Sequence, residues 1–96
     1  MSTRAAAIPT LQLDNERVRV TEWRFAPGAE TGWHRHAYDY VVVPITSGSL
    51  LLETNAGNVH AELCAGRSYS RSVGVEHNVI NAGELELVFV EIELKP

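Results

Sequence analysis

The feature that most constrains the fold is a succession of short β-forming runs, each ended by turn residues. The runs occupy residues 17–25, 40–45, 49–54, 59–64, 67–73, 77–80 and 84–94, and glycine, asparagine or serine follows most of them. Runs that recur about every 8–12 residues with such turns are typical of a β-sandwich or barrel. No stretch repeats its apolar residues with a helical period. The sequence therefore predicts an all-β protein, and 96 residues suit a single domain.

The ends of the chain and its composition narrow the class of protein. We expect residues 1–10 to form a flexible N-terminal arm and residues 11–96 to form one barrel. The formal net charge is -4 with no cluster of Lys and Arg, which argues against nucleic acid as the main partner. No stretch approaches the roughly 20 apolar residues of a membrane span, so no membrane partner is expected. The single cysteine, Cys64, fits a reducing cytoplasm, and we expect its side chain to be small and buried.

Two strand-like runs are apolar on both of their faces. They are "VVV" at 41–43 and "LVFV" at 87–90, and neither alternates as a half-exposed strand should. Strands buried on both sides need a second covering surface. In so small a protein a second subunit would supply it, which predicts a homodimer. The alternative is that these strands lie between the edges of the sheets and a loop.

Three of the four histidines stand near the start of a predicted strand. His34 and His36 are two residues apart in an extended segment, so their side chains point to one face with Cβ atoms about 6–7 Å apart. That spacing allows both imidazoles to reach one metal ion. His77 begins an apolar strand shortly after Gly74, whereas His60 alternates with apolar neighbours and is expected to face solvent. The pattern favours a metal cluster of His34, His36 and His77.

The spacing of these histidines and of the glycines around them resembles that of the cupins, which are small double-stranded β-helix barrels. Gly28, His34, His36 and Gly48 fit the first cupin motif, G-x5-H-x-H-x3-4-E-x6-G. The second motif, G-x5-P-x-G-x2-H-x3-N, is fitted by Gly66, Gly74, His77 and Asn81, with Ser72 in the place of proline. The resemblance implies an all-β cupin-type double-stranded β-helix, also called a jelly-roll barrel. More narrowly, the chain is similar to the very small bacterial single-domain cupins, some of which are called β-alanine degradation proteins.

The chain departs from the first motif at its glutamate. Counted from either end, that place falls on Val41 or Tyr40, and Asp39 is the nearest hard ligand. The resemblance implies one divalent transition metal on three histidines, without choosing among Fe, Zn, Ni, Mn and Cu. Whether Asp39, Tyr40 or water completes the site stays open. Three-histidine cupins include Fe(II) dioxygenases, so the resemblance makes a metal-dependent dioxygenase a candidate.

Four further residues are candidates for contact with a substrate. By alternation in the second motif, Tyr69 and Arg71 point inward, and an inward guanidinium can clamp a carboxylate. The alternatives for Arg71 are a structural ion pair with Glu30 or Asp39, or a register one residue away that turns it outward. Tyr69 suits the core equally well, and Asp39 and Tyr40 suit either a polar rim over the metal or a turn.

These features leave two main hypotheses for function, and no single catalytic residue is singled out. One is a small metalloenzyme that acts on a small anionic metabolite, with Fe-dependent oxygenase chemistry as the candidate reaction of an oxidoreductase. The other is a non-catalytic cupin that binds a metal or a metabolite. A third possibility, a structural dimer with a relic site, fits the apolar strands but not the retained spacing of the histidines.

Overall fold

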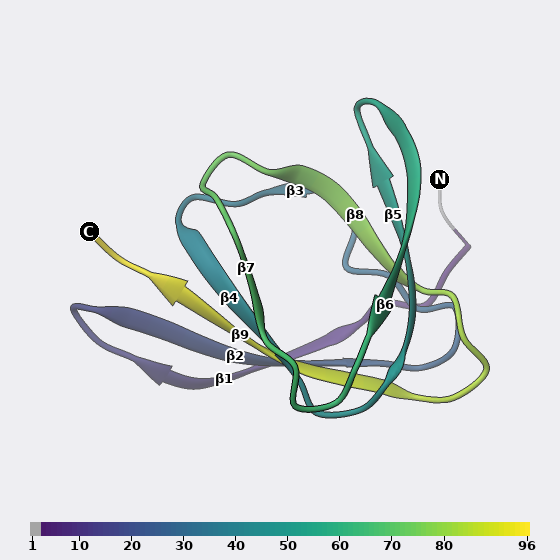
Figure 1. Ribbon diagram of the computed structural model, residues 1–96, viewed down its shortest axis with the longest axis horizontal. Helices are drawn as coiled ribbons and strands as arrows, with labels where there is room; N and C mark the ends of the chain where they lie inside the picture. Colours follow the sequence, from purple (N-terminus) through teal and green to yellow (C-terminus); the bar gives the residue numbers. More distant parts are fainter. Residues whose placement is uncertain (1–2) are drawn as a thin grey trace.

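The structure, a computed structural model, describes residues 3–96 and places them in two facing β-sheets (Figure 1). Nine strands are found in this part of the chain: β1 (Ile8–Asp14), β2 (Val18–Phe25), β3 (His34–Arg35), β4 (Asp39–Pro44), β5 (Gly48–Thr54), β6 (Gly57–Leu63), β7 (Tyr69–Arg71), β8 (Glu76–Asn81) and β9 (Leu87–Leu94). The all-β prediction is confirmed. Because none of residues 3–96 is helical, the described chain has no helix that could cross a membrane.

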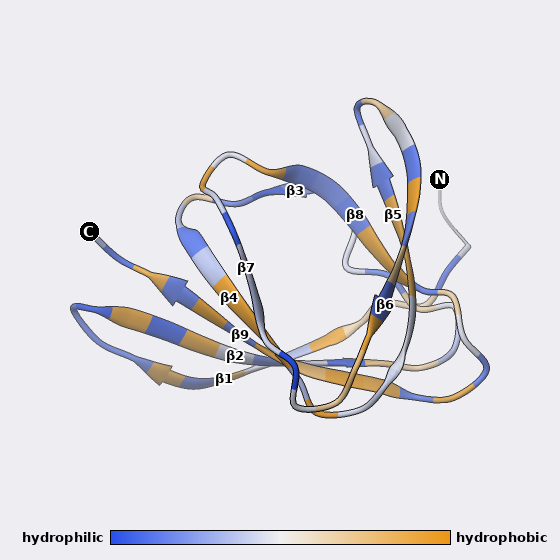
Figure 2. Ribbon diagram, viewed as in Figure 1, coloured by the Kyte–Doolittle hydropathy of each residue, from blue (hydrophilic) through white to orange (hydrophobic). Residues whose placement is uncertain are grey.

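The two sheets have a crossed strand order, which is the signature of a jelly roll. One sheet has the order β1-β2-β9-β4-β7 and the other the order β3-β8-β5-β6. All of the strand pairs are antiparallel, and segments far apart in sequence lie side by side, as β9 does between β2 and β4. Polar and apolar residues alternate along residues 18–21 of β2 and 90–94 of β9 (Figure 2). Every second residue of each strand faces the space between the sheets, as Phe25 and Phe89 do, so Val90 and Ile92 face away from it.

The core fills one end of the barrel. Phe25, Leu87 and Pro44 face inward there, and the rings of Phe25 and Phe89 are 5.4 Å apart at their centroids. The register places Phe25 opposite Leu87 and Pro44 opposite Phe89. At the other end of the same strands Tyr40 lies opposite Glu93 and Arg71. The closed end is therefore apolar, and the polar side chains gather at the open end.

The seven predicted strands correspond to β2 and β4 through β9, and two further strands were not predicted. One of these, β1, begins at Ile8, inside the range expected to be an arm. Residues 1–2 of that arm lie outside the described residues, and its flexibility stays a prediction. The expectation for Cys64 was wrong, because its side chain is exposed. The last inward residue of β6 is Leu63, so Cys64 falls in the turn that follows.

Candidate metal centre

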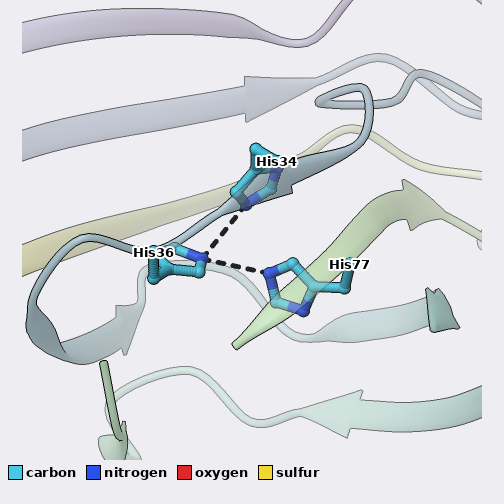
Figure 3. Close-up of side chains that lie close together, drawn as sticks. All are labelled: His34, His36 and His77. Atoms are coloured by element: carbon cyan, nitrogen blue, oxygen red, sulfur yellow. Dashed lines mark hydrogen bonds between the residues drawn. The ribbon is translucent and has the colours of Figure 1, made fainter. Parts of the chain in front are cut away.

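Three histidine side chains converge at the open end of the barrel (Figure 3). His34 lies on β3, His36 follows that strand, and His77 lies on β8 directly opposite His34 in the register. The Nε2 atom of His36 is 3.0 Å from the Nε2 atoms of both His34 and His77. Two nitrogens bound to one ion at about 2.1 Å would lie about 3 Å apart. The expected cluster of three histidines is thus assembled by the fold.

The tautomer of His34 is fixed by its neighbours. Its Nδ1 lies 2.9 Å from the carbonyl oxygen of Gly32 and 3.3 Å from Oγ1 of Thr31. A carbonyl can only accept, so Nδ1 carries the proton and donates it. The Nε2 lone pair of His34 is therefore directed at the cluster, which is the arrangement that second-shell partners give to metal ligands.

The backbone of His36 is held by the turn before β8. Its amide donates to the carbonyl of Val75, and its carbonyl accepts from the amide of Gly74, both at 2.9 Å. Gly74 has a φ of +93°, a conformation that favours glycine. Gly74, a glycine of the second cupin motif, therefore holds the backbone of His36, a histidine of the first motif. The ring of His36 stacks on Tyr40 with centroids 3.8 Å apart.

The electrostatics of the cluster favour a cation at its centre. Burial, reinforced by the neighbouring His34, lowers the pKa of His36 and of His77 to about 4. Both rings are then neutral at pH 7 and offer lone pairs. Nε2 of His36 faces two nitrogens but can carry only one proton, so it can donate to one of them at most. A divalent ion would satisfy all three lone pairs, and this donor set therefore fits a transition metal.

The family of the protein follows from a comparison with known families. Residues 21–93 match the model that is described as the cupin domain. The chain belongs to the cupin family.

Individual cupins extend this result over the whole chain. It is 66% identical over 95 residues to the "Beta-alanine degradation protein BauB" of Pseudomonas aeruginosa, which covers 99% of this chain and 100% of that protein. A solved cupin domain from Bordetella pertussis is 64% identical, with a TM-score of 0.97 and full coverage of both chains. An RmlC-like cupin from Methanocaldococcus jannaschii, 12% identical, has a TM-score of 0.78 over 99% of this chain and 85% of that one. This last likeness shows that the fold is a double-stranded β-helix.

In this cupin a stacked tyrosine stands where the first motif has a glutamate. Tyr40 is buried, and its ring lies nearly parallel to the imidazole of His36 at 18°. Burial raises the pKa of its phenol above the usual range. Asp39 is turned away from the histidines, is exposed, and accepts a hydrogen bond from the amide of Val73 at 2.7 Å. The groups that could hold a metal are His34, His36 and His77 without a carboxylate.

A cavity opens beside the three histidines. His36, His77 and Tyr40 line it together with Tyr69 and Arg71 from β7. The Arg71 guanidinium lies 4.6 Å from the centre of the Tyr69 ring and donates to the carbonyl of Ser70. The remaining walls are largely aliphatic and include Leu50, Leu52, Val59, Ala61 and Val79. The fold thus brings Tyr69, Arg71 and Tyr40 to one space with two of the histidines, but not Asp39.

Glu91 is a site residue that the sequence analysis missed. It lies on β9, lines the same cavity as His36 and His77, and is partly buried. Burial is the main reason that the pKa of its carboxyl is raised to about 7, with Glu93 as a smaller cause. Glu91 shares the parity of Leu87 and Phe89, which face inward in the structure, but the apolar run 87–90 does not reveal that parity in the sequence.

We expect Glu91→Gln to stabilise the metal-free protein at alkaline pH. Above pH 7 the folded state holds a buried carboxylate, whereas the unfolded chain holds a solvated one, so removal of the charge should add about 1–3 kcal/mol to the free energy of unfolding. The gain should shrink as the pH falls below 7, because the folded carboxyl then takes up a proton, and should vanish near the unfolded pKa of about 4.5. Urea denaturation in EDTA at pH 8 and pH 5 measures this difference.

The control is Glu84→Gln, since Glu84 is exposed and its charge stays in water. That variant should change stability little at either pH. An equal effect of Glu91→Gln at both pH values would contradict the burial of the charge.

Proposed function

We propose that this protein is a metal-dependent cupin that acts on a small anionic metabolite at the site of His34, His36 and His77. The observation that carries the proposal is the meeting of three imidazole Nε2 atoms at the edge of a cavity that Arg71 also lines. Three neutral ligands leave the full double charge of a divalent ion uncompensated. Such a site attracts an anion.

Each residue of the site has a distinct role in this proposal. The three histidines hold a divalent transition ion, which when bound supplies a Lewis acid or a redox centre with open positions. Arg71 binds a carboxylate of the substrate, and Tyr69 under its guanidinium keeps the side chain at the cavity. Tyr40 holds the ring plane of His36. The aliphatic walls exclude water from the bound substrate.

The name of the Pseudomonas aeruginosa relative supports a small metabolite. It is called a β-alanine degradation protein, and it is similar to this chain from end to end. The name specifies no reaction. We propose that the substrate is a short carboxylate of that kind of catabolism and that Fe-dependent oxygenase chemistry is the first reaction to test.

We expect Arg71→Gln to weaken the binding of a simple carboxylate by about tenfold, since it removes a charge-assisted hydrogen bond. The measurement is calorimetric titration of Zn²⁺-loaded protein with propionate. Arg67→Gln is the matched control, because Arg67 is exposed and does not line the cavity. Equal affinity for propionate in wild type and in Arg71→Gln would remove Arg71 from the site.

Turnover is tested separately from binding. The Fe²⁺-loaded protein, prepared without a His tag, is mixed with short carboxylates, small thiols and dicarbonyls, and oxygen consumption is followed. Consumption that depends on one of these substrates and is lost in His77→Ala supports an oxygenase. Metal and carboxylate binding without turnover would support the alternative of a non-catalytic binding cupin.

We also propose that the protein is a homodimer. Val20 of β2, Val41 and Val43 of β4, and Val90 and Ile92 of β9 form what we call the outer apolar face. The register places Val43 opposite Val90, and Ile92 between Val41 and Val20. These side chains point away from the barrel interior and are only partly buried within one chain. A second copy across a two-fold axis would cover this face, and the single cysteine suits the reducing cytoplasm that we propose as its location.

A further inference from the structure

Glu91 lies between two depressions of the protein, the cavity beside the histidines and a second groove, and it lines both of them. The cavity of Arg71 and Tyr69 lies on one side, and a groove lined by His34, Trp23 and Glu93 lies on the other. Among the residues that line these two hollows, only His36 and Glu91 belong to both. The carboxyl of Glu91 is therefore a neighbour of the histidine cluster without belonging to it.

Two of the three acidic or basic side chains that line the cavity, Arg71 and Glu91, lack a charged partner within the described residues, whereas the third, Glu62, accepts a hydrogen bond from Ser49. Neither Arg71 nor Glu91 forms a salt bridge there, with each other or with another side chain. The indole N–H of Trp23 is near enough to lower the pKa of the Glu91 carboxyl, yet Trp23 Nε1 is buried with no partner in hydrogen-bonding geometry. A partly buried carboxylate is stabilised by a cation or by several donors. A bound molecule with a cationic end would supply such a partner.

The distance between the two charges is set by the sheet. Val42 of β4 lies opposite Tyr69 on one side and opposite Glu91 on the other, and Tyr40 lies opposite Arg71. Arg71 and Glu91 thus stand two strand spacings apart and two residues apart along the strands, about 12 Å at the backbone, on the same inner face. Val42 and Phe89 supply an apolar surface beside them. The arrangement suits a molecule with two oppositely charged ends and a short alkyl segment between them.

We propose that the cavity binds a small amino acid as a zwitterion, with its carboxylate on Arg71 and its ammonium group on Glu91. This inference rests on the proposed function of the same cavity and names its substrate class. Glu91 is then a specificity residue: it distinguishes an amino carboxylate from a carboxylate of the same length that has no amine. It is assigned no part in the chemical step.

The test compares β-alanine with propionate, which has the same carbon chain and no amine. Both are titrated calorimetrically into Zn²⁺-loaded protein at pH 8, where Glu91 is ionised and the amine of β-alanine is still protonated. We expect wild type to bind β-alanine at least about tenfold more tightly than propionate, as one charge-assisted contact allows. In Glu91→Gln the two affinities should become equal, while that for propionate stays as in wild type or improves.

Glu93→Gln is the matched control. It makes the same change of charge two residues away on the same face of β9, but Glu93 lines the groove and not the cavity. The preference for β-alanine should survive there. An equal affinity for the two probes in wild type, a preference that persists in Glu91→Gln or is lost equally in Glu93→Gln, or no binding of β-alanine would each overturn the proposal. If propionate still binds through Arg71, the proposed function stands although the amino-acid specificity fails.

Discussion

Replacement of His77 by alanine is expected to reduce the metal content of the protein from about one ion per chain to background. The Nε2 atoms of His36 and His77 are 3.0 Å apart, and removal of one leaves two imidazoles for the ion. Loss of an outer-shell partner already weakens metal sites about 10–100-fold, and loss of a direct ligand should exceed that. The measurement is elemental analysis of untagged protein after anaerobic reconstitution with Fe²⁺ and dialysis.

His60→Ala is the control for this loss. His60 lies on β6, is exposed, and is outside the cluster, so that variant should keep its metal. Because His77 is buried, its replacement by alanine also leaves a space in the barrel. His77→Gln fills more of that space, and circular dichroism of both variants shows whether they fold. A folded His77→Gln protein that holds as much metal as wild type would contradict the three-histidine site.

Most of the strands and the three-histidine cluster could be predicted from the sequence, because they are marked by patterns of neighbouring residues. Alternation, turn residues and motif spacing each span only a few positions, and the three motif histidines meet as the spacing predicts. The strand β1 gave no such signal. All of its residues are exposed, and its register against β2 shifts between Leu11 and Leu13, which breaks the alternation. A strand of two residues such as β3 is too short for any pattern.

Glu91 was missed because the sequence of its strand does not show which residues face the barrel interior. Four glutamates occur in residues 84–94, and the apolar run 87–90 gives no indication of which face is inward. The inward set becomes evident only when β9 lies between β2 and β4, with Phe89 opposite both Trp23 and Pro44. Pairings of this kind join residues more than 40 positions apart, and a single sequence does not specify them.

The sequence also could not identify which side chain near the glutamate position of the first motif contacts His36. Spacing offered Tyr40, Val41 and Asp39, and only the placement of β4 in its sheet decides which of them meets His36. Tyr40 faces inward and stacks on the imidazole, while Asp39 caps the amide of Val73 outside the cluster. The stack covers a ligand ring with an aromatic surface, so the missing carboxylate is replaced by packing and not by another donor atom.

The adjacent strands β4 and β9 connect the surroundings of the histidine cluster to the outer apolar face. Their inner faces carry Tyr40 and Glu91, and their outer faces carry Val41, Val43, Val90 and Ile92. A subunit packed on that outer face would restrain the same backbones that position the cavity wall. A dimer formed through this face would therefore bear on the site, and the proposed dimer can be tested by a single substitution.

We expect Ile92→Asp to convert the proposed dimer into monomers. Ile92 lies at the middle of the outer apolar face, between Val20 and Val41, and a two-fold interface would bury the new carboxylate twice. An unpaired buried charge costs several kcal/mol, more than a small interface can offset. Within one chain the same carboxylate can reach solvent, so the barrel itself should remain folded. Light scattering after gel filtration gives the mass of each species directly.

Leu85→Asp provides the comparison, because Leu85 is 81% exposed in the turn before β9 and lies outside the outer apolar face. It introduces the same charge on an apolar side chain and should leave the dimer intact. If wild type is a monomer at micromolar concentration, or if Ile92→Asp stays dimeric, the covering subunit does not bind here. If the variant is monomeric and still takes up one metal ion, the three histidines of one chain suffice for the centre, as their convergence within a single barrel predicts.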